Sequence, residues 1–399
     1  MIEPFISAVP VLKKLEDSGF EAYFVGGSVR DYLLSSQIHD VDIATSATPE
    51  EVKRIFSTTV DIGIEHGTVL VIFQKESYEV TTFRAEADYQ DYRRPKEVSF
   101  IRNLRDDLQR RDFTMNAIAM DRFGQIVDPF DGRRAIKEKI IQTVGQANDR
   151  FQEDALRMMR AVRFVSQLSF SIEGNTILAL TRLVHLLEKI AVERKRAEFE
   201  KLLTGKNCKN ALRIMLETNL YSYLPGLGDE KEQIERLLSF EFENFNKNEM
   251  WSLLLFCLDL EEKSIGSFLR EWRLPGKEIK EIQHIFHFLT KRFEKEWDSF
   301  DLYLAHEETI KSVEALFQVI NGIHDKDAID KWISIYNQLP IKHRSEMKVT
   351  GSDLMDWFDQ KGGPWLSERL SFIEHAIIVG HITNDKLYIK EWLKRCSQK

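Results

Sequence analysis

Two aspartates separated by one residue, Asp40 and Asp42 in the stretch QIHDVDIATS, constrain this sequence more than any other feature. Residues 38–45 alternate and are rich in β-branched side chains, which predicts a strand. Side chains two apart on a strand share a face, so we expect the two carboxylates to project together while Val41 and Ile43 point into a core. Carboxylates this close repel each other unless a cation lies between them, and oxygen ligands suit Mg²⁺.

A glycine turn precedes the aspartates in the stretch FEAYFVGGSVRDYLL. The pattern predicts an apolar strand, a turn at Gly26 and Gly27, and a helix that contains Arg30. The glycines let backbone amides approach a phosphate, and the helix N-terminus favours the same anion. An Asp-x-Asp pair alone is usually a solvated strand face, and a Gly-Gly turn is usually only a turn. Their combination in one short stretch is much more specific.

Composition describes a soluble globular protein: 399 residues, 43% hydrophobic and 30% charged. No apolar run approaches the roughly 18–20 residues of a membrane span, and the first residues lack a secretory signal. The three cysteines are scattered without metal-ligand spacing, which favours reduced thiols in a cytoplasmic protein. A net charge of −8 argues against a protein that coats nucleic acid uniformly.

The chain predicts an α+β fold, with mixed strand and helix patterns to about residue 150 and helices beyond it. A β-hairpin is expected in HGTVLVIFQKESYEVTTFR, with its turn at residues 75–77. Within it Glu79 faces away from Tyr78 and Val80, either as a solvated position or as a third carboxylate beside the aspartate pair. Residues 84–105 are rich in charge and predict a long mobile loop around Arg93-Arg94-Pro95. Other predicted elements are helices at 4–19, 28–35, 176–190, 193–204, 207–218, 231–240, 247–258 and 262–272, and a strand at 22–25.

The segment FQEDALRMMRAVRFVSQLSF predicts one helix on which polar residues recur at every third position, namely Asp154, Arg157, Arg160 and Arg163. On an arbitrary helix this pattern is most often a solvated salt-bridge ladder. However, an acceptor-only Asp beside a donor-only Arg matches the hydrogen-bonding edges of cytosine and adenine. Uracil and guanine would leave buried groups unpaired, at about 1–3 kcal/mol each. Arg160 and Arg163 would then neutralise phosphates.

Together these motifs resemble the class II tRNA nucleotidyltransferases (CCA-adding enzymes) of the DNA polymerase beta superfamily, most closely the short bacterial type. The C-terminal half matches only loosely, through LYSYLPGL, VTGSDL, GGPW and the final EWL. The stretches that match in family order over the first 205 residues are FVGGSVRDYLL, HDVDIATSATPEE, HGTVLVI, RRPKEVSF, LQRRDFTMNAIAM, DPFDGRRAIKEKIIQTVG, EDALRMMRAVRF and ERKRAEFEKLLTG.

The resemblance implies a nucleotidyltransferase head at residues 1–147, a helical neck at 148–205, a body at 206–320 and a tail at 321–399. It implies Mg²⁺ at Asp40 and Asp42, with Glu79 as a third catalytic carboxylate. Residues 193–203 resemble a segment that braces the base-recognition helix. The nucleotide-binding residues that it implies are Gly26, Gly27, Arg30, Arg111, Asp112, Asp154, Arg157, Arg160 and Arg163.

The implied activity adds CCA to the 3′ end of tRNA from CTP and ATP, without a nucleic-acid template. The tRNA 3′-hydroxyl attacks the nucleotide α-phosphate in line, and two Mg²⁺ ions assist. In the tail, Lys342, Arg344, Lys348 and Trp365 are candidates for contact with the tRNA elbow, although for each a solvated or core role is more common. The sequence leaves the oligomeric state open, and the resemblance allows a homodimer.

Several sister activities share this core. Bacterial poly(A) polymerases carry a GRRF-like stretch where this chain has DIGIEHGTVLVI, and CC-adding enzymes lack the long loop that holds DYRRPKEVSF here. Both observations favour complete CCA addition. The motifs do not distinguish enzymes that add the complete CCA from enzymes that add only A. Outside the class, the alternatives are a non-catalytic RNA-binding protein with a decayed head and a metal-dependent phosphohydrolase. His39-Asp40 and His324-Asp325 lack the histidine cluster that a phosphohydrolase would need.

Overall fold

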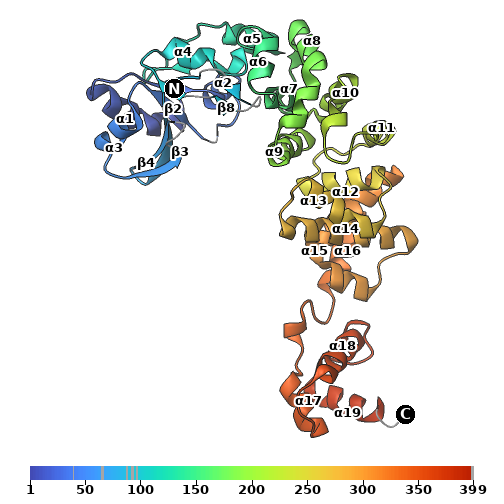
Figure 1. Ribbon diagram of the computed structural model, residues 1–399. Coiled ribbons are helices and arrows are strands. Elements are labelled where there is room, and N and C mark those ends of the chain that lie inside the picture. Colours follow the sequence, from blue (N-terminus) through green and yellow to red (C-terminus); the bar gives the residue numbers. More distant parts are fainter. Residues whose placement is uncertain (39, 64–66, 87–88, 91–93, 96–97, 397–399) are drawn as a thin grey trace. The chain divides into compact units, whose positions relative to one another are not determined.

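A computed structural model describes residues 1–38, 40–63, 67–86, 89–90, 94–95 and 98–396 (Figure 1). The chain forms two compact units, Met1–Lys231 and Glu232–Lys399. The first unit holds a mixed sheet with helices and the second is helical, so the predicted α+β fold is confirmed. Within the described ranges, no helix has the length and apolar character needed to cross a membrane.

The described strands of the first unit form a seven-stranded sheet in the order β11-β10-β1-β2-β5-β4-β3. Neighbouring strands are antiparallel except β2 and β5, which run parallel. Parallel strands need a long connection, and here it contains α3 (Pro49–Ile55), β3 and β4. The strands are β1 (Ala22–Val25), β2 (Asp42–Thr45), β3 (Thr59–Gly63), β4 (Thr68–Phe73), β5 (Glu76–Thr82), β10 (Ala119–Met120) and β11 (Ile126–Val127).

One row of cross-strand partners runs across the whole sheet. Its members, from edge to edge, are Val60, Leu70, Glu79, Asp42, Val25, Ala119 and Val127. Register partners lie on the same face of a sheet, so this row defines the face that carries the acidic residues. Asp42 occupies the central strand of the row.

The two faces of the sheet are covered differently. The face opposite the acidic residues packs against α1 (Phe5–Asp17) and α3 (Pro49–Ile55), with the Phe5 and Phe24 rings 4.8 Å apart. A Thr48–Glu51 capping box starts α3, as its sequence predicts. On the acidic face, α4 (Leu104–Gln109) covers the β1–β2 region, where Leu108 packs with Ala44 in a buried cluster. The acidic face therefore remains more open toward β4 and β3, where Val60 and Ile72 are exposed.

The strand at the aspartates is shorter than predicted. It begins at Asp42, so the expectation that Asp40 and Asp42 share one strand face is wrong for Asp40, which lies just before the strand. The pattern could not show this, because β2 finds its partners only within Asp42–Thr45. His39 lies outside the described residues.

The predicted hairpin is confirmed as β4 and β5, but its turn is at Gln74 and Lys75 rather than at residues 75–77. Both turn residues have positive φ, +52° and +72°, as a two-residue turn between twisted strands requires.

The predicted loop at 84–105 is wrong in the part that the structure describes. There, β6 (Arg84–Glu86) pairs with β9 (Val98–Phe100), and β7 (Tyr89–Gln90) pairs with β8 (Arg94–Pro95). Each strand has only two or three residues, too few for an alternating pattern to be visible among the charges. Arg93 and residues 87–88, 91–92 and 96–97 lie outside the described residues.

The helices predicted after residue 150 are confirmed, apart from three details. The helix expected at 176–190 is α-helical only to Leu183 and continues as a 3-10 helix over Val184–Lys189. A small ribbon joins β12 (Ile140–Ile141) to β13 (Ser171–Ile172), and the single helix expected around residues 151–168 is two helices that meet at Asp154. The helices of this region are α5 (Gly132–Glu138), α6 (Ala147–Glu153), α7 (Leu156–Leu168), α8 (Gly174–Leu183), α9 (Val192–Leu203), α10 (Cys208–Glu217) and α11 (Lys231–Leu238).

The second unit has an aromatic core, in which the Trp251 and Trp272 rings lie 5.1 Å apart. Among the proposed tail contacts, Arg344 binds the Glu374 carboxylate, and its elbow role stays a prediction together with those of Lys342, Lys348 and Trp365. The four-part domain division also stays a prediction. The helices are α12 (Lys247–Cys257), α13 (Glu262–Glu271), α14 (Gly276–Glu294), α15 (Ser299–Asn321), α16 (Lys326–Asn337), α17 (Gly351–Phe358), α18 (Pro364–Ile378) and α19 (Lys386–Cys396).

The close packing of α7 against the α9–α10 connection generates a stability prediction. A Cβ at Gly205 would lie 2.7 Å from the Ser166 carbonyl carbon, and Ser166 is fully buried in α7. We expect Gly205→Ala to lower the free energy of unfolding by about 1–3 kcal/mol in urea titrations, because backbone must move. Gly174→Ala is the matched control, since no atom lies within 4 Å of its added Cβ. Equal urea midpoints for Gly205→Ala and the unmodified chain would contradict the packing described.

Candidate active site

The carboxylates that the sequence singles out gather at the start of β2. Asp42 is the register partner of Glu79 on β5, and both side chains are exposed while Ile43 and Val80 beside them are buried. Burial and then the negative charges of Asp42 and Asp40 raise the pKa of Glu79. Although Asp42 is exposed at the surface, desolvation by the surrounding protein raises its pKa, with Arg111 opposing the shift and Asp40 adding to it. Glu79 therefore lies beside the aspartate pair, and its catalytic role stays a prediction.

The donor chemistry of this cluster fits a cation that arrives with a substrate. In the described part of the chain, no three His, Cys, Asp or Glu side chains converge into a closed metal cage. Mg²⁺ is commonly held by one or two carboxylates, while phosphate oxygens and water complete its shell. Asp40 and Asp42 provide such an open set, and their mutual repulsion favours a bound cation.

Gly26 brings backbone, guanidinium and carboxylate together at the end of β1. It has φ = +72°, and an added Cβ would lie 3.0 Å from Arg111 Nη1 and 3.6 Å from Asp42 Oδ2. A side chain here would be strained and would crowd both groups. Gly27 then begins α2 (Gly27–Leu33), so amides at the helix start lie next to Arg111 and Asp42. This arrangement suits a phosphate that binds beside the carboxylates.

Arg30, predicted to contact the triphosphate, is buried among protein partners. Its Nη1 donates to Asn116 Oδ1 at 2.7 Å, and its Nε donates to Asp31 Oδ1 at 2.9 Å. The guanidinium carbon lies 5.3 Å from the centre of the Phe164 ring on α7. Arg30 thus connects α2 to α7, and a triphosphate contact stays a prediction.

Asp112 is the junction between the sheet and α7. Its Oδ1 accepts from Asn116 Nδ2 at 3.1 Å, and its Oδ2 accepts from Arg160 Nε at 2.8 Å. Although burial opposes ionisation, Arg160 and the Asn116 hydrogen bond lower the pKa of Asp112 to about 2. Both carboxylate oxygens are held by protein donors, so a direct nucleotide contact by Asp112 stays a prediction.

The arginines of α7 are held from the other side by α9. Arg163 Nε lies 2.5 Å from Glu198 Oε2, and Arg160 Nη1 lies 3.9 Å from Glu198 Oε1. Burial lowers the pKa of Arg163 to about 10, although Glu198 opposes this shift. The α9 helix spans Val192–Leu203, so the segment expected to brace α7 does pack against it. The two arginines lie in one charged network with Asp112 and Glu198.

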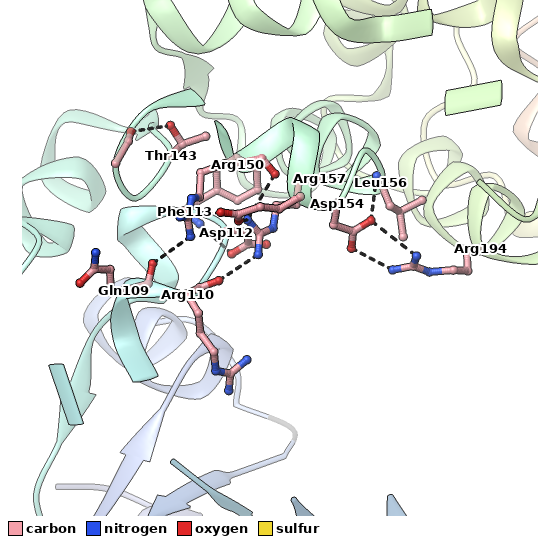
Figure 2. Close-up of polar contacts among 12 residues, drawn as sticks. Gln109, Arg110, Asp112, Phe113, Thr143, Arg150, Asp154, Leu156, Arg157 and Arg194 are labelled. Carbon is pink, nitrogen blue, oxygen red and sulfur yellow. Dashed lines mark hydrogen bonds and ion pairs between the residues drawn. The ribbon is translucent and has the colours of Figure 1, made fainter. Parts of the chain in front are cut away.

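Asp154 and Arg157 do not lie on one helix, so that part of the prediction is wrong (Figure 2). Asp154 has extended backbone angles between α6 and α7, and its Oδ1 accepts from the Leu156 amide at the start of α7. Residues with short acceptor side chains commonly interrupt or start helices in this way, and this competes with the helical pattern. The two residues are joined through their backbones, since the Arg157 amide donates to the Asp154 carbonyl at 3.0 Å. Their side chains turn toward different partners, Asp154 toward Arg194 and Arg157 toward Arg110 (Figure 2).

Each member of this pair binds a protein partner. Asp154 Oδ2 accepts from Arg194 Nη2 at 2.9 Å. Arg157 is buried and donates from Nη1 to Glu153 at 2.8 Å and from Nη2 to the Arg110 carbonyl at 2.9 Å (Figure 2). Asp154 and Arg157 could form hydrogen bonds with a base only if the base displaced or shared these contacts with Arg194, Glu153 and the Arg110 carbonyl.

Sequence reasoning missed four residues that hold the site together. Asp107 is 1% exposed and accepts from Arg110 at 2.8 Å and from Arg111 at 3.3 Å. Its spacing of three and four residues from two arginines was a visible helical signal. Asn116 acts across a long sequence separation, and no local pattern points to it. Arg194 and Glu198 lie in the segment 193–203 that the resemblance singled out, but neither residue was predicted individually.

The lowered pKa of Asp112 generates a pH prediction. Its contribution to stability is present above the ordinary Asp pKa of 3.8 and is lost as pH falls toward the folded value of about 2. At pH 6, we expect Asp112→Asn to lower the free energy of unfolding by about 2 kcal/mol. In urea titrations the difference from the unmodified chain should shrink between pH 4 and pH 2. A difference that stays constant through that window would refute the ion-pair assignment. Asp149→Asn, at an exposed position nearby, is the control.

Three protein families match successive parts of the chain. The poly A polymerase head domain matches residues 22–142, the probable RNA and SrmB-binding site of polymerase A matches residues 169–230, and a putative tRNA nucleotidyltransferase domain 2 matches residues 242–393. The first match contains the sheet and its carboxylates, and the second contains α9.

Known proteins also match this chain over nearly its whole length. The CCA-adding enzyme of Bacillus mycoides (strain KBAB4) is 48% identical over 397 residues, which are 99% of this chain and 100% of the relative. The CCA-adding enzyme of Bacillus cereus (strain Q1) is 47% identical over the same shares. The crystal structure of the Bacillus stearothermophilus CCA-adding enzyme in complex with CTP is 42% identical, with a TM-score of 0.90 over 100% of this chain and 98% of that one. The chain therefore belongs to the CCA-adding enzyme family.

Proposed function

We propose that this chain adds CCA to the 3′ end of tRNA from CTP and ATP, releases pyrophosphate and uses no nucleic-acid template. The observation that carries the proposal is the full-length similarity to CCA-adding enzymes, joined to the Asp42–Glu79 pair at the centre of the sheet. Full-length similarity matters because the sheet alone is shared with other nucleotidyltransferases.

Mg²⁺ is the proposed cofactor, with Asp40 and Asp42 as its protein ligands and Glu79 beside them. Bound there, it would neutralise phosphate charge and favour ionisation of the attacking hydroxyl. The chain itself positions the nucleotide. The amides at Gly26 and Gly27 and the Arg111 guanidinium receive the triphosphate next to Asp42. Positioning and charge stabilisation are sufficient for phosphoryl transfer without a covalent enzyme intermediate.

Asp154 and Arg157 are the proposed base-selecting pair. One accepts and the other donates hydrogen bonds, which matches cytosine and adenine but not uracil or guanine. The base would take over part of the bonding that Arg194 and the Arg110 carbonyl provide. Arg160 and Arg163 line the same pocket, held in place by Asp112 and Glu198.

We also propose how the chain is divided into domains. The divisions are a catalytic head at 1–147, a neck at 148–205, a body at 206–320 and a tail at 321–399 that contacts the tRNA elbow. The family relation and the tRNA substrate support a cytoplasmic location. A homodimer is left to measurement.

One assay distinguishes complete CCA addition from its relatives. The chain is incubated with tRNA ending in N, NC or NCC and with CTP and ATP, singly and together. We expect the N ending to gain CC from CTP alone and CCA from both nucleotides. Addition of A only, of CC only or of long A tails would instead identify the sister activities, and no addition would identify an RNA-binding protein.

The carboxylate assignment predicts that Asp42→Ala abolishes the incorporation of both C and A. The variant should bind tRNA with unchanged affinity in a filter assay, because the lost group holds the reacting phosphate and its cation. Asp61→Ala is the matched control, since Asp61 is another exposed aspartate of the same sheet and pairs only with Lys53 at 2.9 Å among its described contacts. Incorporation by Asp42→Ala at the normal rate would remove the metal assignment.

The base-selection assignment predicts that Asp154→Ala weakens discrimination against UTP. The ratio of kcat/KM for CTP to that for UTP should fall by about tenfold, because one unpaired buried group no longer penalises uracil. Asp149→Ala, at an exposed site in the same helical segment, should keep the normal ratio. If Asp154→Ala also keeps it, this residue does not read the base.

A further inference from the structure

The sheet offers a second surface beside the carboxylates, on the side away from the proposed nucleotide site. Val60 is 46% exposed and Ile72 is 39% exposed, and Leu70 is half-buried between them and Glu79. Leu70 pairs in register with Glu79 and with Val60, and Ile72 pairs with Ser77. All three side chains therefore lie on the acidic face of the sheet. We name Val60, Leu70 and Ile72 the apolar strand surface.

The order of the strands decides which substrate meets this surface. The groups proposed to receive the triphosphate lie on the β1–β10 side of β2: Gly26 follows β1, and Arg111 comes shortly before β10. In an in-line displacement, the attacking and leaving oxygens lie on opposite sides of the phosphorus. If the pyrophosphate departs toward Gly26, the attacking hydroxyl lies on the opposite side of the phosphorus, and in the order of the strands the neighbour of β2 on that side is β5. That side continues directly into β4 and β3.

The spacing of the strands suits a tRNA acceptor end whose 3′-hydroxyl lies at the carboxylates. Adjacent strands are about 5 Å apart, so Leu70 lies about 5 Å from Glu79 and Val60 about 10 Å from it. A terminal nucleotide whose 3′-hydroxyl reaches Asp42 would therefore lay its ribose and base over these strands.

The chemistry of the surface suits an acceptor whose last base changes. Each round of addition leaves a new terminal nucleotide, so a hydrogen-bonding site for one base would fail for the next. Apolar side chains contact the face of any base or ribose without reading its edge. We propose that the apolar strand surface holds the 3′-terminal nucleotide of the tRNA acceptor, an inference that rests on the proposed nucleotide-adding function.

A second copy of the chain is a poorer occupant, although β3 is an edge strand. The register shifts between Asp61 and Gly63, which interrupts the hydrogen-bond ladder at this edge. Asp61 also carries a charge and pairs with Lys53 at 2.9 Å. Bulges and charges are features that hinder pairing of one sheet edge with another.

The test replaces the two exposed members of the surface in a Val60→Gln, Ile72→Gln double variant. We expect KM for tRNA to rise by about tenfold in single-nucleotide addition, equally for tRNA ending in N, NC and NCC. KM for CTP and the urea unfolding midpoint should not change. Val127→Gln is the matched control, because Val127 lies in the same row at the opposite edge of the sheet and is 36% exposed. It should leave both KM values unaltered.

A second readout does not depend on catalysis. A tRNA with 2-aminopurine as its terminal base should change fluorescence on binding to the unmodified chain and to Val127→Gln, and this change should be lost in the double variant. If the unmodified chain adds nucleotides but both readouts are normal in the double variant, the inference is wrong and the function stands. A raised KM for CTP, or an altered oligomeric state with normal tRNA kinetics, would also overturn it. If the unmodified chain adds no nucleotide while the fluorescence still depends on Val60 and Ile72, the function fails and the surface stands.

Discussion

The parallel pairing of β2 with β5 is the constraint on which the rest of the site depends. It joins two strands separated by thirty residues and sets Asp42 beside Glu79 in the middle of the sheet. Two carboxylates in register would destabilise a sheet if they were buried without a partner, because like charges in adjacent positions repel. The fold keeps this pair exposed, and although desolvation raises the pKa of Asp42, the Arg111 charge opposes that shift. A nucleotide with its divalent cation would offset the remaining repulsion, so the proposed reaction site is also the position where like charges meet.

A network of buried polar groups couples this sheet to the helices around the proposed base-selecting residues. It runs from Arg30 through Asn116 to Asp112, then to Arg160 and Glu198. Breaking a buried pair costs more than the pair itself contributes, since the surviving charge is left without a partner. The network is therefore better understood as a device that fixes geometry than as a large source of stability. It holds α7 against the catalytic strands, so the proposed triphosphate and base positions keep a constant separation.

Much of the fold follows from local sequence, and the shortfalls have physical causes. The helices after residue 170 and the β4–β5 hairpin were predictable because each repeats its pattern over several residues. The ribbons between residues 84 and 100 were not, since two or three residues carry no period. At the site, alternation correctly placed Asp42 and Glu79 on strand positions that face away from the core, whereas Asp40 lies before the strand. The helix break at Asp154 was hidden by an unbroken helical pattern on both sides. Asn116, Arg194 and Glu198 act only through tertiary contacts, so one sequence could not reveal them.

Metal binding in the presence of a nucleotide tests the central claim most directly. Free Mn²⁺ can be followed by electron paramagnetic resonance while it is titrated into the chain, with and without a CTP analogue that cannot react. The open carboxylate set predicts weak binding to the chain alone and much tighter binding when the analogue is present, since phosphate oxygens complete the coordination. An Asp40→Asn, Asp42→Asn variant should lose this gain. Equal Mn²⁺ binding by the variant and the unmodified chain would place the cation elsewhere and contradict the account of the site.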